Sequence, residues 1–236
     1  MDPATISAHL LDHVPFHVAI GVTLLLDAVL LAGLSWAYRS PRFAQYLLRA
    51  PMKMKVSQAN YRWTVATTGL LSSLATVALV YGLAPWTVST APTAWWVPVL
   101  QGLGILFVYD FAYYFMHRLL HVRALMPLVH EVHHRVRFPS ALESLYLSPI
   151  EMLAGLGLLM AVTALVGPIH WTAFAVVFFV YSTLHIIIHS GMRFPYPGFG
   201  VINYLTLKHH KHHLNKHGHN YASVTPLPDI VFRTSI

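Results

Sequence analysis

The stretch HRLLHVRALMPLVHEVHH, from His117 to His134, contains an H-x3-H group followed by an H-x2-HH group. Both spacings recur, as HIIIH from His185 to His189 and within HHKHH from His209 to His213. On a helix of about 3.6 residues per turn, side chains four positions apart lie about 40° apart around the axis, so each group places imidazoles on one stripe. The histidines of the four groups are His117, His121, His130, His133, His134, His185, His189, His209, His212 and His213.

These ten imidazoles are more than one metal ion uses, because a structural zinc site, for example, takes about four ligands. Neutral imidazole suits iron, copper, zinc and nickel. The chain has no cysteine, which excludes thiolate ligands, disulfides and iron–sulfur clusters. A single histidine pair near a membrane is more often a surface feature, but four groups at helical spacing favour ligation. We therefore predict a two-metal site, with no catalytic residues beyond the ligands.

The composition is that of a membrane protein. Hydrophobic residues make up 56% of the chain and charged residues only 10%, whereas soluble domains are about 25% charged. Because we find no polar linker and no internal repeat, we expect a single integral-membrane domain over residues 1–236. Within this all-α helical bundle, residues 1–94 would supply N-terminal membrane helices and a basic connector, and 95–236 the histidine-box region.

Five apolar stretches are long enough to cross a hydrocarbon core of about 30 Å. They cover roughly residues 17–37, 63–84, 95–116, 149–168 and 171–189, and the last two could instead form a tight hairpin. Asp27 lies inside the first stretch, where an acidic residue is costly; it could be functional, but a hydrogen bond to a neighbouring helix is the favoured interpretation. Pro85 and Pro92 mark a turn after the second.

The basic residues predict how the chain crosses the membrane. All fifteen Lys and Arg residues fall in three segments, 39–62, 118–137 and 193–233. Because basic residues are retained on the cytoplasmic side, the N-terminus should lie outside and every histidine group at the cytoplasmic face. Residues 1–16 lack a basic n-region, so we do not expect a cleaved secretory signal. The net charge of +7 then reflects topology rather than nucleic-acid binding.

The histidine groups and their surroundings resemble the fatty acid hydroxylase / sterol desaturase superfamily. The resemblance rests on DFAYYFMHRLLH (Asp110–His121), HEVHHR (His130–Arg135), SPIE (Ser148–Glu151), HIIIHSG (His185–Gly191) and HHKHH with a later HNYA (His209–Ala222). It implies a membrane-bound non-haem di-iron enzyme that uses O2 and two electrons to hydroxylate or desaturate a lipid-like substrate, such as a fatty acyl chain or sterol. Two Fe ions would be the cofactor, with Zn as a substitute in purified protein.

Several residues near the groups are candidates for contacts behind the ligands. Asp110 lies two helical turns before His117 and could orient its imidazole, or else bond to another helix. Glu151 is a second candidate because it begins the fourth apolar stretch. His217, His219 and Asn220 closely follow the last histidine group and could add a contact there.

The sequence has no dinucleotide fingerprint, haem module or flavin domain, so we expect a separate electron donor of the ferredoxin, cytochrome b5 or reductase type. The substrate should be apolar and enter from the bilayer. An alternative is a histidine-lined metal transporter or metal-binding membrane protein, which would carry polar residues through its spans. A catalytically inactive lipid-binding relative is a third possibility. The last residues show no ER-retrieval signal, which favours a bacterial cell membrane over the ER.

Overall fold

The computed structural model describes residues 14–50, 56–214 and 218–236. Its long helices are α2 (Val14–Arg39), α3 (Gln58–Thr87), α4 (Trp96–Leu120), α6 (Pro149–Val166) and α7 (Trp171–Ile188). All five are long and apolar enough to cross a membrane, since even 18 residues extend about 27 Å at 1.5 Å per residue. The expected all-α, multi-pass architecture is confirmed.

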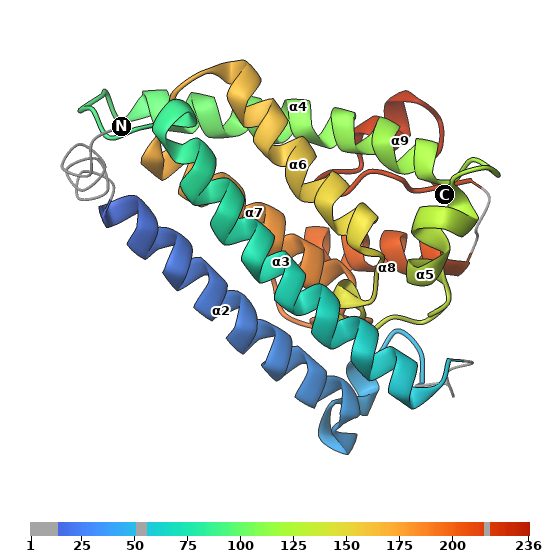
Figure 1. Cartoon of the computed structure of the whole chain (residues 1–236). Coiled ribbons are helices and arrows are strands. Elements are labelled where there is room, and N and C mark those ends of the chain that lie inside the picture. Colours follow the sequence, from blue (N-terminus) through green and yellow to red (C-terminus); the bar gives the residue numbers. More distant parts are fainter. Residues whose placement is uncertain (1–13, 51–55, 215–217) are drawn as a thin grey trace.

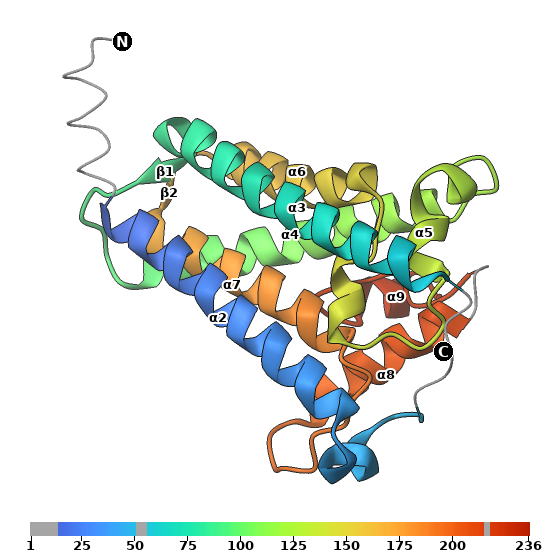
Figure 2. The same cartoon turned by 60° about the horizontal axis from the view of Figure 1, so that its bottom comes forward.

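Short elements join the long helices and gather mainly at one end of the bundle. They are η1 (Pro41–Tyr46), β1 (Val88–Ser89), η2 (Met126–His130), α5 (Glu131–His134), η3 (Ala141–Leu145), β2 (Ile169–His170), α8 (Gly200–Leu214) and α9 (Leu227–Val231). Figure 1 shows the long helices crossing the molecule, with α5, α8 and α9 grouped at one end. In Figure 2, β1 and β2 lie at the opposite end. The histidine-bearing helices therefore form a cap on the bundle.

Residues with local capping chemistry begin three of the long helices. The Ser57 hydroxyl accepts a hydrogen bond from the backbone N–H of Asn60 at the start of α3. At the start of α6, Ser148 accepts one from the Glu151 N–H, and Pro149 occupies the first turn, where its missing N–H costs nothing. His170 caps α7 in the same way. These caps satisfy N–H groups that an apolar surrounding would leave unpaired.

The bundle core lies on the side of β1 and β2, away from the cap. There the rings of Phe16 and Phe174 meet edge to face with their centroids 5.4 Å apart, within a buried apolar cluster that also contains Leu159. The two-residue parallel pair of Val88 with Ile169 and Ser89 with His170 ties the end of α3 to the α6–α7 connection. This half of the protein is thus a packed apolar support for the cap.

The second apolar stretch is longer than expected, because α3 continues past Pro85 to Thr87. Proline already has a helical φ, but it lacks the N–H that would bond to the carbonyl four residues earlier, and its ring crowds that carbonyl. In the last turn that loss removes a single hydrogen bond, so Pro85 does not begin the turn. The span predicted at about 63–84 thus corresponds to α3, which begins five residues earlier and ends three residues later.

The basic connector after α2 lies at the cap end. The Leu48 N–H donates to the Gly191 carbonyl oxygen over 2.8 Å, and the Arg193 N–H donates to the Tyr46 carbonyl oxygen over 2.6 Å. Gly191 has φ 64°, and a Cβ there would come within 2.6 Å of the Pro139 carbonyl oxygen, so this close approach requires glycine. Two of the three basic segments thus meet at the end of the bundle that carries the histidines.

Candidate metal centre

Nine of the ten predicted histidines converge in two groups. In each group, the ligand atoms offered by the imidazoles all lie within 4.8 Å of one another. The first group contains His117, His121, His130, His134 and His212. The second contains His133, His189, His209 and His213. All except the partly exposed His121 are buried.

Both H-x2-HH groups are divided between the two clusters. His130 and His134 enter the first cluster while His133, between them, enters the second. On α8 the division is reversed, with His209 and His213 in the second cluster and His212 in the first. The expectation that each H-x2-HH group presents a single stripe was therefore wrong, because positions four apart share a face whereas position three lies about 60° away on the other side. The two clusters therefore interlock through α5 and α8.

Within the clusters, unprotonated ring nitrogens of neighbouring imidazoles face each other. The pair His133 and His189 is an example. The Nδ1 of His133 lies 3.2 Å from the Tyr146 carbonyl oxygen, and that of His189 lies 2.6 Å from the His185 carbonyl oxygen. A carbonyl oxygen only accepts, so each Nδ1 carries the proton of a neutral ring. Both Nε2 atoms are then bare, and they lie 3.1 Å apart. This arrangement is repulsive unless a cation lies between the two nitrogens.

Other members of both clusters are held in the same tautomer. Backbone carbonyl oxygens contact the Nδ1 atoms of His117, His212 and His213, from Tyr221 at 2.7 Å, His219 at 2.8 Å and Val136 at 3.0 Å respectively. Sequence reasoning missed these supporting positions, because any residue type supplies a carbonyl. The donor set, buried and directed inward through Nε2, fits metal ions of the kind that imidazole prefers.

Burial keeps the rings outside the membrane-spanning helices neutral. It lowers the pKa of His130 to about 3 and that of His133 to about 4. Burial, with neighbouring histidines adding to it, also holds the pKa values of His209, His212 and His213 well below the usual value. At neutral pH each of these rings therefore has one N–H and one nitrogen with a free lone pair, which is the form that binds metal.

Glu151 contacts a cluster histidine directly, as the sequence suggested. Its Oε1 lies 2.8 Å from Nδ1 of His130, so the carboxylate accepts a hydrogen bond from the Nδ1–H group. The unprotonated Nε2 of His130 then lies 3.0 Å from Nε2 of His117. A carboxylate behind a metal-binding imidazole fixes the tautomer and makes the ring a stronger donor.

Asp110 does not take the position expected for it. Its carboxylate accepts hydrogen bonds from the backbone N–H groups of Val224 and Thr225, both at 2.9 Å, and from the Thr225 hydroxyl. The Nδ1 of His117 faces the Tyr221 carbonyl instead. The expected direct contact with His117 is therefore corrected: Asp110 anchors the segment that carries that carbonyl, because unpaired N–H groups beside the apolar helices need an acceptor.

The residues after the last histidine group have different roles. His219 supports His212 through its backbone carbonyl. Asn220 adopts φ 62°, and its side chain accepts from the Ile236 N–H and donates to the Lys208 carbonyl, so it fastens the C-terminal segment to α8. His217 lies outside the described residues. His219 is not a member of either histidine cluster.

His185 is the one predicted ligand that the structure leaves outside both clusters. Its Nε2 lies 3.0 Å from the Ser144 carbonyl oxygen, to which it donates. Its ring centroid is nevertheless 4.6 Å from that of His189. Its role as a ligand stays a prediction.

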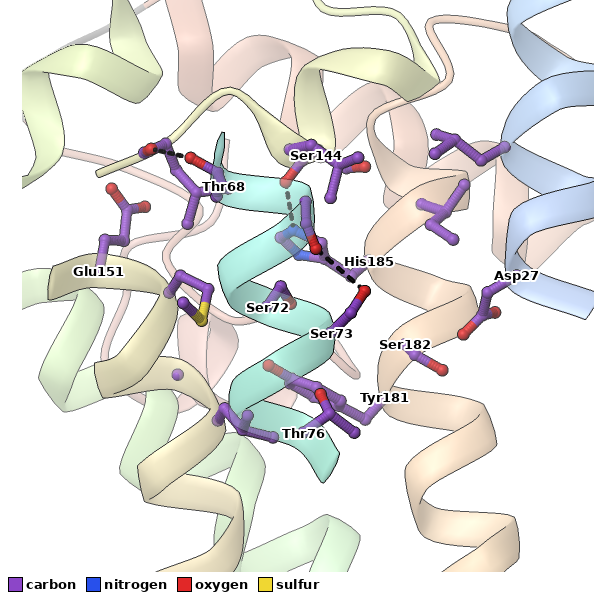
Figure 3. A pocket seen from close by; sticks show the side chains of 18 of the residues that line it. Asp27, Thr68, Ser72, Ser73, Thr76, Ser144, Glu151, Tyr181, Ser182 and His185 are labelled. Atoms are coloured by element: carbon purple, nitrogen blue, oxygen red, sulfur yellow. Dashed lines mark hydrogen bonds between the residues drawn. The ribbon is translucent and has the colours of Figure 1, made fainter. Parts of the chain in front are cut away.

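A cavity of about 380 Å³ opens beside the clusters. Its walls come from α2, α3, α4, α6 and α7, and Figure 3 shows Glu151, Ser144, His185 and Asp27 among the polar side chains that line it. Tyr113, Glu151 and His185 also line a small space bordered by His117, His133, His189 and His209. The cavity and the space at the histidines therefore lie on two sides of the same wall residues.

Comparison with known proteins agrees with this arrangement. The model of the fatty acid hydroxylase family matches residues 102–234, which include all ten predicted histidines. The chain belongs to the fatty acid hydroxylase family. The resemblance read from the histidine boxes is thereby confirmed, and the N-terminal helices α2 and α3 lie outside the matched region.

Curated relatives within this superfamily carry different activities in their names. Methylsterol monooxygenase 1 of Rattus norvegicus is 29% identical over 60% of this chain and 48% of its own length. Very-long-chain aldehyde decarbonylase GL1-8 of Oryza sativa subsp. indica is 35% identical over 62% and 56%. Methylsterol monooxygenase 2-2 of Arabidopsis thaliana is 30% identical over 62% and 56%. The chain thus spans about half the length of these relatives, and no solved structure matches it.

Proposed function

We propose that this fatty acid hydroxylase family protein is a membrane-bound di-iron oxygenase that hydroxylates or desaturates a lipid-like substrate. The facing lone pairs of the buried histidines carry the proposal, since the bare Nε2 atoms of His133 and His189, 3.1 Å apart, repel each other, and a cation between them would relieve that repulsion. The names of the relatives support oxidation of a lipid.

The two clusters would each hold one ion, with His117, His121, His130, His134 and His212 at the first and His133, His189, His209 and His213 at the second. Two iron ions would supply the oxidising chemistry: with O2, two electrons and two protons, a C–H bond becomes C–OH and the second oxygen atom leaves as water. We expect the electrons to come from a separate donor protein, because the described part of the chain shows no second redox module.

The protein's own part is to hold ligands, admit an apolar molecule and exclude water. Glu151 and the carbonyl oxygens fix the imidazoles in the metal-binding tautomer. The cavity beside Glu151 offers an apolar route from the bilayer to the clusters. Exposed leucine and phenylalanine side chains on the long helices, such as Leu103 and Phe107, suit contact with lipid tails.

The alternative function, metal transport, would require a polar route continuing from the clusters to the far end of the bundle. The described core there is apolar and includes Ile105, Leu159 and Phe174. That composition favours an oxygenase over a transporter.

The test is metal content and O2-dependent lipid oxidation in detergent-purified protein. Wild type should bind close to two ions per chain, and His212→Ala should lose metal and activity. His210→Ala is the matched control, because His210 lies on the same helix, is buried, and belongs to neither cluster. Zinc in place of iron calls for reconstitution with iron before assay. At most one ion, unchanged in His212→Ala, contradicts the proposal.

A further inference from the structure

Asp27 places a carboxylate in the wall of the cavity, in the middle of a membrane-spanning helix. It lies halfway along α2, about 18 Å from either end at 1.5 Å per residue. The residue is 9% exposed and lines the cavity of about 380 Å³. Figure 3 shows Asp27 and Glu151 on opposite sides of this cavity. An acidic side chain at this depth is costly and needs a reason.

Helix packing alone does not supply that reason. Asp27 Oδ1 accepts a hydrogen bond from the Thr183 hydroxyl of α7 at 3.0 Å. The Ser182 hydroxyl of α7 is a second polar contact of the Asp27 carboxyl group, although it also donates to the Phe178 carbonyl of its own helix, as Thr23 does to the Ala19 carbonyl. Thr183 has the same option four residues back, so it does not require a carboxylate. A carboxylate can accept about four hydrogen bonds, more than Thr183 and Ser182 supply.

We propose that Asp27 binds the hydroxyl group of an amphipathic lipid whose apolar remainder lies in the cavity and reaches the histidine clusters. The inference rests on the proposed function, because it names the substrate class of that site. The cavity and the space beside the clusters share Tyr113, Glu151 and His185 in their walls. A molecule held at Asp27 therefore extends toward the ligands without leaving the protein.

The surroundings of Asp27 favour a neutral hydroxyl over an ammonium group. The cavity wall beside it is apolar or hydroxyl-bearing, with Leu24, Ala28, Leu31, Ser182 and Ile186. Transferring an ammonium group to this depth is much more costly than transferring a hydroxyl group. A hydroxyl also pairs with Asp27 in either protonation state, as a donor to the carboxylate or an acceptor from the acid.

The position of Asp27 would also set which carbon meets the clusters. Its partner Thr183 precedes His189 by six residues on α7, a rise of about 9 Å. A lipid tethered at this depth presents a defined segment to the metal-binding end, whereas an untethered one slides. Loss of the tether should therefore broaden the positions that are oxidised.

The experiment compares three probes that differ only at one end: hexadecanol, hexadecane and hexadecylamine. Their binding to detergent-purified full-length protein is measured at equilibrium without turnover. Wild type should bind the alcohol at least tenfold more tightly than the alkane. Asp27→Leu should reduce this preference below twofold and leave alkane binding unchanged. Asp27→Asn, which keeps an acceptor oxygen, should give an intermediate preference for the alcohol over the alkane. This variant replaces Asp27→Leu in the test if the leucine variant does not fold.

Thr23→Val is the matched control, because Thr23 is a buried polar residue one turn before Asp27 and does not line the cavity. It should keep the wild-type preference. A preference that survives Asp27→Leu, an absent preference in wild type, or tighter binding of the amine overturns the inference. Oxidation of the bound lipid is measured separately. If the protein prefers the alcohol in binding but oxidises neither probe, the proposed function is contradicted and the role of Asp27 is not. If it oxidises the alcohol and the alkane equally well, the role of Asp27 is contradicted and the proposed function is not.

Discussion

Lys208 and Asp229 form a buried ion pair, with 2.6 Å between Nζ and Oδ2 and side chains 3% and 0% exposed. Lys208 Nζ also donates to the Ala222 carbonyl, and Asp229 accepts from the backbone N–H groups of Tyr221 and Ala222. The pair therefore holds the segment whose Tyr221 carbonyl supports His117. The C-terminal segment is fastened to α8 at the point where it meets the first cluster.

Removing one partner of this pair should destabilise the protein and loosen the first cluster. Lys208→Met leaves the Asp229 charge buried without its partner, which typically costs about 3–5 kcal/mol. We expect a lower unfolding temperature and weaker metal binding, measured by thermal unfolding and by chelator competition. Lys211→Met, on the exposed side of the same helix, should match wild type. Equal unfolding temperatures for the two variants would contradict a structural role for the pair.

Glu151 should matter for metal affinity more than for folding. Glu151→Ala removes the acceptor of the His130 Nδ1 proton, and loss of such a partner typically weakens metal binding about 10–100-fold. Glu151→Gln keeps an acceptor oxygen at a similar position, so its loss should be smaller. Competition with a chelator of known affinity measures both. Identical affinities for Ala, Gln and wild type would show that the contact is incidental.

The metal-free protein should lose stability as the pH falls from about 6.5 toward 4. Burial lowers the pKa of His133 from 6.5 to about 4 and that of His130 to about 3, so below 6.5 the unfolded chain binds protons that the folded chain does not. Each such histidine costs about 1.4 kcal/mol per pH unit in this window. Thermal unfolding of metal-free protein between pH 7.5 and 4 checks the direction.

Metal-loaded protein is the internal comparison for the pH series. Bound metal keeps the imidazoles deprotonated, so unfolding temperatures of the loaded protein should stay constant to lower pH. A pH profile that is the same with and without metal would argue against the histidines as its origin.

The absence of cysteine makes the proposed topology directly testable. A cysteine introduced at the exposed Arg123, near the clusters, should react with a membrane-impermeant thiol reagent only from the cytoplasmic side. One at the exposed Thr93, in the connection before α4, should react only from the other side. Labelling of both from the same side would contradict the topology inferred from the basic residues.

The sequence alone predicted the five long helices and the convergence of most of the predicted ligands. Hydropathy located five spans because lipid-facing helices must be apolar throughout, and the spacing of His130 and His134 indicated a shared helical face. It did not predict which cluster each histidine enters. That depends on how α5 and α8 are turned relative to α4, which only tertiary packing sets.

Contacts made by backbone atoms were beyond the reach of sequence reasoning. Asp110 was predicted as a partner of His117 because the two share a helical face. Its carboxylate oxygens instead accept hydrogen bonds from the backbone N–H groups of Val224 and Thr225. His117 is held by the Tyr221 carbonyl, for which no side-chain pattern exists. The division of the chain into residues 1–94 and 95–236 stays a prediction.

The division of α5 and α8 between both clusters has a consequence for how metal is loaded. In the proposed two-metal site, an ion held by His130, His134 and His212 would fix the same segments, α5 and α8, that present His133, His209 and His213 to the other ion. The first binding event therefore bears the entropic cost of fixing α5 and α8, and the second bears little of it. Filling should be positively cooperative, so chains with one ion would be scarce at half saturation and most would hold either none or two.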